Sequence, residues 1–149
     1  MWGSVVVFLI AVATACSRPT GSSPDAAMIT EFRNSERAAL RTFNDLLAKQ
    51  RANQIDELEL ANAIDRQALP QWRKLRARTT AATAVLPHRE LYVILRRYLA
   101  SRQTSWEAYT AALRSPSDEA ARPHYAVYRA QDAAAVDDAR QLGQAFRGP

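Results

Sequence analysis

The chain contains few side chains of the kinds that catalyse reactions or bind metal ions. It has two histidines, His88 and His124, and one cysteine, Cys16. Neither histidine has an acidic residue three positions before it, so the Glu-x-x-His pairs of di-iron bundles are absent from the sequence. Motifs for covalent haem, for a nucleophilic serine and for a glycine-rich phosphate loop are absent too. We therefore predict no enzyme, no cofactor and no metal ligands.

Acidic residues that are close in the sequence do not form an evident acid–base pair. Asp56, Glu57 and Glu59 lie together, as do Asp137 and Asp138. Both groups are typical of a solvated helix surface. The chain also has only four glycines and no long loop of the kind on which active sites usually lie.

Positive charge is the most informative chemical property of the chain. Residues 65–102 hold nine Lys or Arg residues and two acidic ones, a net charge of +7, whereas the whole chain carries +5. Anionic lipid headgroups would attract such a surface, with each cation adding about 1 kcal/mol. An acidic envelope protein or polymer is another candidate partner. The interpretation that needs no partner, and that comes first, is a solvated face with favourable cations near a helix C-terminus. The predicted binding residues are Arg73, Lys74, Arg76, Arg78, Arg89, Arg96 and Arg97.

The N-terminal segment has the pattern of a signal peptide. Residues 5–15 form an apolar stretch of 11 residues. A membrane-spanning helix needs about 20 apolar residues, whereas the apolar region of a signal peptide has about 7–15. Small residues, Ala13 and Ala15, precede Cys16.

This junction resembles the lipobox of bacterial lipoproteins, in which a small residue precedes a cysteine that receives a diacylglyceryl group through its sulfur. Ala15 and Cys16 match that pattern, while Ala13 stands where leucine is commoner and residues 1–4 lack Lys and Arg. The resemblance covers 16 residues. It implies cleavage after Ala15 and a palmitate-type lipid on Cys16. Ser17 stands where an aspartate tends to retain lipoproteins in the inner membrane, so the resemblance implies the outer membrane.

Two other interpretations of this segment stay open. Residues 13–15 also match the A-x-A site of an ordinary signal peptide, which would leave Cys16 as a free thiol in a secreted or periplasmic protein. The third interpretation is an uncleaved helical anchor. Residues 17–23 read SRPTGSS, a linker composition that favours a lipid tether. We therefore divide the chain into a signal peptide (1–15), a lipidated cysteine with a flexible linker (16–23) and a helical domain (24–149).

The composition of the remaining chain predicts an all-α fold. Alanine occurs 29 times, and good helix formers dominate after position 15. Helix starts are predicted at Ser23-Pro24-Asp25, at Asn53 with Asp56, and at the Ser-Pro signal of residues 115–118. Pro87 marks a turn between the second and third helices.

Four long amphipathic helices with short links predict an antiparallel up-down bundle, with an irregular helical array as the alternative. Pro70 lies inside the second helix, expected over 54–85, and should kink it. Pro123 leaves the start of the fourth helix open. In an up-down bundle, the basic end of helix two, the start of helix three and the tether before helix one meet at one pole.

Aromatic residues recur at helical spacing among Leu and Ala, which favours a packed core over a ligand cavity. They are Trp72, Tyr98, Trp106, Tyr109, Tyr125 and Tyr128. The alternative is a small-ligand carrier with a pocket near Trp72, Trp106 and Tyr109.

The function that we predict is a membrane-anchored envelope lipoprotein whose helical domain binds or scaffolds without catalysis. An accessory or inhibitor protein that acts through the basic pole is a further alternative. No nucleic-acid recognition motif is present, so we expect no nucleic-acid partner.

Overall fold

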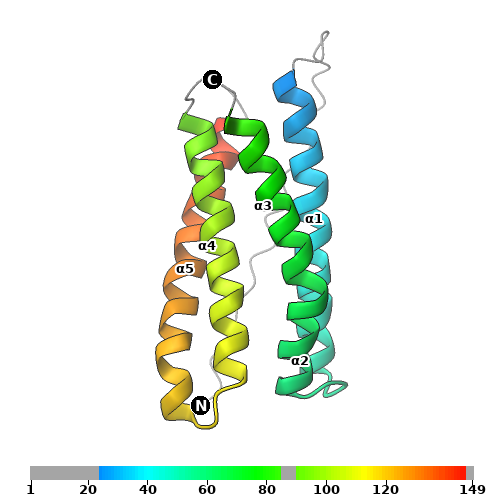
Figure 1. The fold of residues 1–149 in the computed structure, drawn as a ribbon, viewed down its shortest axis with the longest axis vertical. Helices are drawn as coiled ribbons and strands as arrows, with labels where there is room; N and C mark the ends of the chain where they lie inside the picture. Colours follow the sequence, from blue (N-terminus) through cyan, green and yellow to red (C-terminus); the bar gives the residue numbers. More distant parts are fainter. Residues whose placement is uncertain (1–23, 85–89, 147–149) are drawn as a thin grey trace.

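The described residues form four long helical rods that lie side by side in an antiparallel bundle (Figure 1). The structure, a computed structural model, describes residues 24–84 and 90–146. The predicted all-α up-down bundle is confirmed, and no strand occurs in the described ranges. The second rod is continuous through a π-helical turn. In chain order the elements are α1 (Pro24–Arg51), α2 (Glu57–Ala63), η1 (Ile64–Ala68), α3 (Leu69–Ala84), α4 (Glu90–Leu113) and α5 (Asp118–Ala145).

The end of α1 is closed by a Schellman motif around Asn53. Asn53 has a φ of 53°, a left-handed conformation that asparagine adopts more readily than most residues. Its N–H donates to the Gln50 carbonyl at 3.0 Å, and the Gln54 N–H donates to the Lys49 carbonyl at 2.9 Å. The predicted role of Asn53 as an N-cap was therefore wrong, because this residue ends α1.

Asp56 is the residue that begins the second rod, at Glu57 and not near Gln54. The Glu59 N–H donates to Asp56 Oδ1 at 2.7 Å, and the Asp56 N–H donates to Glu59 Oε2 at 2.9 Å. This reciprocal capping box satisfies two N–H groups that a helix start leaves without intrahelical partners. The acidic cluster thus fixes a helix end.

Pro70 of α3 lies just after the π-helical turn η1, at the place in the second rod where the sequence predicted a kink. Proline lacks an N–H, and its ring clashes with the carbonyl four residues earlier, which belongs to Arg66. In η1 the Leu69 N–H donates to the Ile64 carbonyl, five residues back. A π turn is one of the features that accompany such breaks in the regular hydrogen-bond ladder, and the rod continues beyond it as α3.

The start of α5 was left open in the sequence and is set by Ser117. Its side chain accepts the Ala120 N–H at 3.3 Å, so α5 begins at Asp118. Pro123 therefore lies inside the helix, in the second turn. The Pro24 start of α1 agrees with the prediction, while the turn around Pro87 lies outside the described residues.

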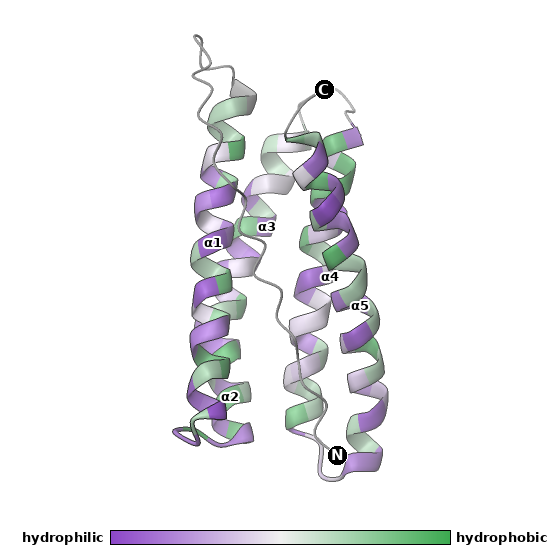
Figure 2. Ribbon diagram, turned by 180° about the vertical axis from the view of Figure 1, so that it is seen from behind, coloured by the Kyte–Doolittle hydropathy of each residue, from purple (hydrophilic) through white to green (hydrophobic). Residues whose placement is uncertain are grey.

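A layer of aromatic rings fills the centre of the bundle. Phe43 of α1 stacks on Trp106 of α4, with ring centroids 4.3 Å apart and an interplanar angle of 1°. Trp72 of α3 is fully buried beside Trp106, and its indole N–H donates to the Leu99 carbonyl at 3.0 Å. Figure 2 shows apolar and polar residues alternating along the helices, as expected of amphipathic helices around one core.

Small side chains separate α4 from α5. Ser101, Ser105 and Ala108 are buried on α4, and Ala121 and Ala135 are buried on α5. Such residues let two helix backbones approach closely. The α4–α5 hairpin therefore combines close backbone approach with the ring contact between Tyr109 and Tyr128 and the Arg97–Asp138 ion pair.

Candidate functional site

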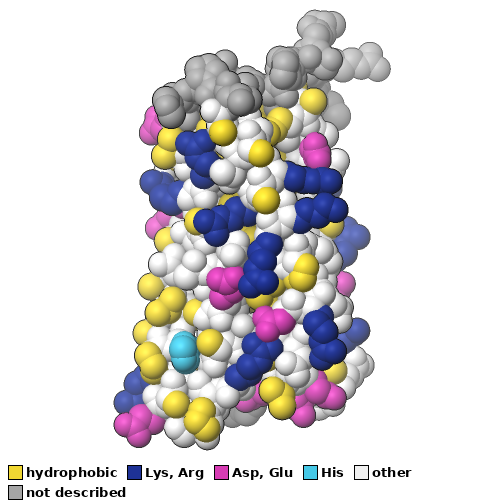
Figure 3. All heavy atoms as spheres, viewed as in Figure 1, with side chains coloured by type: hydrophobic (Ala, Val, Ile, Leu, Met, Phe, Trp, Pro, Cys, Tyr) yellow, Lys and Arg dark blue, Asp and Glu magenta, His cyan; other side chains and the backbone are white. Residues whose placement is uncertain are grey.

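The predicted basic residues lie on one side of the bundle, over α3 and α4. Figure 3 shows Lys and Arg side chains gathered there, mostly in the half that contains the end of α3. That end lies beside the starts of α4 and α1 (Figure 1). Arg89 lies outside the described residues. We call the other six the basic face: Arg73, Lys74, Arg76, Arg78, Arg96 and Arg97.

These cations occupy the side of the bundle and not its tip. Arg78 lies six residues before Ala84, the end of α3, and Arg73 lies eleven before it. At a rise of 1.5 Å per residue, these positions are about 9–16 Å from the end of the helix. The basic residues were expected at one end of the bundle, and those described lie instead along the sides of α3 and α4, near that end.

Three arginines of the basic face have carboxylate partners on other helices. Arg73 pairs with Glu107 of α4 at 2.8 Å, and Arg78 pairs with Glu31 of α1 at 3.3 Å. Arg97 pairs with Asp138 of α5. These acids lower the net charge of the face below the value that the sequence of residues 65–102 suggests.

Asp138 corrects the expectation that the Asp137–Asp138 pair is solvated. It is only 3% exposed, whereas Asp137 lies on the surface and pairs with Arg140 at 2.8 Å. A buried carboxylate is costly unless a charged donor reaches it. Arg97 supplies that donor through two nitrogens, and this hydrogen bond raises the pKa of Arg97.

Arg76 and Arg96 differ, because their partners are neutral. Arg76 Nη1 donates to the Gln103 side-chain carbonyl at 3.1 Å. Arg96 Nη1 donates to the Thr83 hydroxyl at 3.2 Å. Neither forms an ion pair within the described residues, and the same holds for the exposed Lys74.

These bonds define a seam where α3 faces α4. Glu107 lies at the far end of this line from Arg96, and Arg73 and Gln103 both donate to it. Burial raises the pKa of Glu107. The hydrogen bonds from Arg73 and Gln103, together with the charges of Arg73 and Arg76, lower this pKa by more than burial raises it, so the net shift is downward. The α3–α4 seam comprises Arg73, Arg76, Thr80 and Thr83 on α3 and Arg96, Ala100, Gln103 and Glu107 on α4.

A buried polar network that the sequence did not reveal joins three helices. The Tyr98 hydroxyl of α4 donates to Glu36 of α1, and Arg102 of α4 pairs with Asp132 of α5. Burial raises the pKa of Glu36, against lowering effects of the Tyr98 hydrogen bond and the nearby Arg102 charge. Burial also raises the Tyr98 pKa well above its usual value. Helical spacing alone does not give pairs that are 62 and 30 residues apart.

The six aromatic residues pack against one another and against Phe43. Trp72, Trp106 and Tyr98 are buried, and the Trp72 and Trp106 ring centroids are 4.9 Å apart. Tyr109 is half-buried, with the Tyr128 ring at 5.0 Å. The space beside these rings is thus filled by ring packing. The pKa of Tyr109 is raised to about 12. Burial is the largest cause, and the nearby Tyr125 and Tyr128 hydroxyls add to it.

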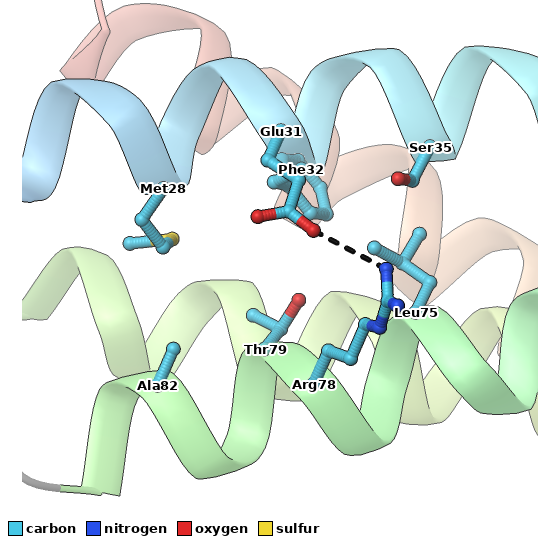
Figure 4. A pocket seen from close by; sticks show the side chains of 8 residues that line it. All are labelled: Met28, Glu31, Phe32, Ser35, Leu75, Arg78, Thr79 and Ala82. Atoms are coloured by element: carbon cyan, nitrogen blue, oxygen red, sulfur yellow. Dashed lines mark hydrogen bonds and ion pairs between the residues drawn. The ribbon is translucent and has the colours of Figure 1, made fainter.

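A shallow groove, open to solvent, lies between α1 and α3 (Figure 4). Met28, Phe32 and Leu75 supply apolar lining, and the Glu31–Arg78 ion pair lies at the edge. It lies apart from the Trp106 and Tyr109 rings, which do not line it.

Metal binding and membrane spanning find no support in the described part of the chain. No group of three or more His, Cys, Asp or Glu residues there is able to hold a metal ion. No described helix combines the length and apolar character needed to cross a membrane. His124 is exposed. His88, Ala15 and Cys16 lie outside the described residues.

The comparisons with known proteins add no family. No protein-family model, no curated protein and no solved structure matches this chain.

Proposed function

We propose that this protein is a lipid-anchored envelope protein whose helical domain binds anionic partners through its basic face, without catalysis. The observation that carries the proposal is an arrangement of helix ends. Helix α1 begins at the end of the bundle where α3 ends and α4 begins (Figure 1). A tether at Cys16 would therefore hold the cationic half of the bundle near the membrane.

The length of the linker supports this orientation. Residues 17–23, seven in number, span at most about 25 Å when fully extended. The cations of α3 lie about 9–16 Å from its end, which is within that reach. A domain held so close can turn its side to the surface, and attraction falls off within a Debye length of about 8 Å.

The anchor is tested by the Cys16→Ala variant in the bacterium. Metabolic labelling with a fatty acid and membrane fractionation are compared with the wild type. We expect the label to disappear and the protein to leave the membrane fraction. Unchanged labelling and fractionation would refute the lipid anchor.

Binding through the basic face is tested by crosslinking of the intact anchored protein. Lys74→Glu combined with Arg96→Glu reverses two cations that lack carboxylate partners among the described residues. Arg97 is left in place, because a glutamate there would lie beside the buried Asp138. We expect crosslinks to anionic components to be lost while circular dichroism stays unchanged. Retained crosslinks would assign binding to another surface.

A further inference from the structure

The two arginines with neutral partners stand apart from the rest of the basic face. A guanidinium group has five N–H donors, and the neutral contacts of Arg76 and Arg96 each use one nitrogen. Arg73, Arg78 and Arg97 already donate to carboxylates. All five arginines carry the same charge. The fold alone distinguishes the two whose partners are neutral, and these two remain able to bind an external anion.

We infer that Arg76 and Arg96 form a binding site for the phosphate group of an anionic phospholipid headgroup. This inference rests on the proposed function and names the ligand of the same surface. Both side chains are half-buried in the α3–α4 seam. Water screens charges in such positions less than at a fully exposed surface.

The register of the two helices sets the dimensions of the site. Arg96 bonds Thr83, and Arg76 bonds Gln103, so the two arginines lie seven residues apart along the seam. Seven residues correspond to about 10 Å. Long arginine side chains that extend toward each other can both reach a phosphate group placed between them.

The residues between the two arginines have small side chains. Thr80 lies four residues after Arg76 and three before Thr83, so it shares their side of α3. Ala100 lies four residues after Arg96 and three before Gln103, on the facing side of α4. Thr80 is exposed and offers a hydroxyl, and Ala100 has a small side chain.

The electrostatics of the seam favour a phosphate. The seam contains three arginines and one carboxylate, Glu107, which lies at the end away from Arg96. Arginine presents planar, forked donors that match two phosphate oxygens, and such charge-assisted bonds are stronger than those to a neutral hydroxyl or amide. A phosphate would thus provide stronger acceptors than Thr83 and Gln103 do.

The test uses the full chain reconstituted in vesicles of phosphatidylcholine, with or without phosphatidylglycerol. A fluorophore on Ala81→Cys, an exposed position of α3, reports proximity to quencher-labelled headgroups. Ala126→Cys, an exposed position of α5 outside the basic face, is the control. The signal of the chain without an added cysteine is subtracted. Two matched double variants each remove two positive charges: Arg76→Gln with Arg96→Gln, and Arg73→Gln with Arg78→Gln.

We expect phosphatidylglycerol to increase quenching at position 81 and not at position 126. The Arg76 and Arg96 variant should weaken that response roughly fivefold per arginine. The Arg73 and Arg78 variant should weaken it less, because these two arginines already donate to carboxylates. Equal losses in both variants would overturn the specific site but leave the proposed charge-driven binding intact. No response of the wild type to phosphatidylglycerol would overturn both. Binding of inorganic phosphate without vesicles, lost in the Arg76 and Arg96 variant, would overturn the lipid as the source.

Discussion

Glu36 has an environment that opposes its ionisation. It lies half-buried on α1, where Tyr98 donates to it and Arg102 lies near. Burial raises its pKa in the folded chain above the ordinary value of 4.5. The protonated form is therefore favoured by folding, and the stability that this gives is lost as the pH rises through the raised pKa.

Glu36→Gln should unfold with a higher free energy than the wild type at pH 7, because a neutral amide avoids the cost of burying a charge. The glutamine carbonyl can still accept the Tyr98 hydroxyl. Urea denaturation at pH 7 and at pH 4.5 measures the difference, which should shrink at the lower pH. Glu31→Gln, on the exposed side of α1, is the control. If Glu36→Gln is instead less stable than the wild type at pH 7 but not at pH 4.5, the attraction of Arg102 and its neighbours for the carboxylate outweighs the cost of burying it.

Tyr109 makes stability depend on alkaline pH. Its pKa is raised from 10.0 to about 12, so folding favours the protonated phenol and stability is lost as the pH rises from 10 toward 12. A phenylalanine has no proton to lose. Tyr109→Phe should therefore avoid a loss of up to about 2–3 kcal/mol over that range. Denaturation at pH 10 and pH 12 tests this, and parallel losses in both proteins would contradict it.

At the scale of elements, polar side chains set helix boundaries that apolar periodicity alone misplaces. Asp56 caps α2 through a reciprocal pair of bonds with Glu59, and Ser117 caps α5. Asn53 instead closes α1 in a left-handed conformation. The same class of residue therefore starts or ends a helix according to backbone geometry.

Asp56→Ala should lower the free energy of unfolding by about 0.5–2 kcal/mol, because it leaves a helix N–H without its acceptor. Asp56→Ser keeps an acceptor oxygen at this position and should recover most of that loss. Chemical denaturation of the three proteins provides the comparison. If serine is as destabilising as alanine, the cap does not hold the start of α2.

At the scale of the whole molecule, rings and ion pairs join helices that are distant in the sequence. Phe43 connects α1 to Trp106 of α4, and the Arg97–Asp138 and Arg102–Asp132 pairs connect α4 to α5. The aromatic layer and the buried charges thus fix how the four rods are rotated about their axes.

Phe43→Ala should destabilise the fold by about 3–5 kcal/mol, because it removes a buried ring and leaves a cavity beside Trp106. Val127→Ala, on the exposed surface of α5, should cost no more than about 0.5 kcal/mol. Urea denaturation of both variants measures the two costs. Similar values would mean that α1 does not pack on α4 through this ring.

The sequence by itself determined the number and order of the helices, the start of α1 and the surplus of positive charge. These properties depend on residues close along the chain, because helical rise and rotation are fixed per residue. Two helix ends were not determined in this way. Asn53 ends α1 and does not cap the second helix, and α5 begins after Ser117 and not at Pro123. Such ends depend on backbone conformation.

Only the tertiary structure decided which charges are paired. Arg97 and Asp138 are 41 residues apart in the sequence, and Tyr98 and Glu36 are 62 apart, so local residue spacing does not predict either contact. Periodicity gives the face of a helix that is buried, but not its rotation and register against another helix. That rotation buried Asp138, and it left Arg76 and Arg96 with neutral partners in the α3–α4 seam.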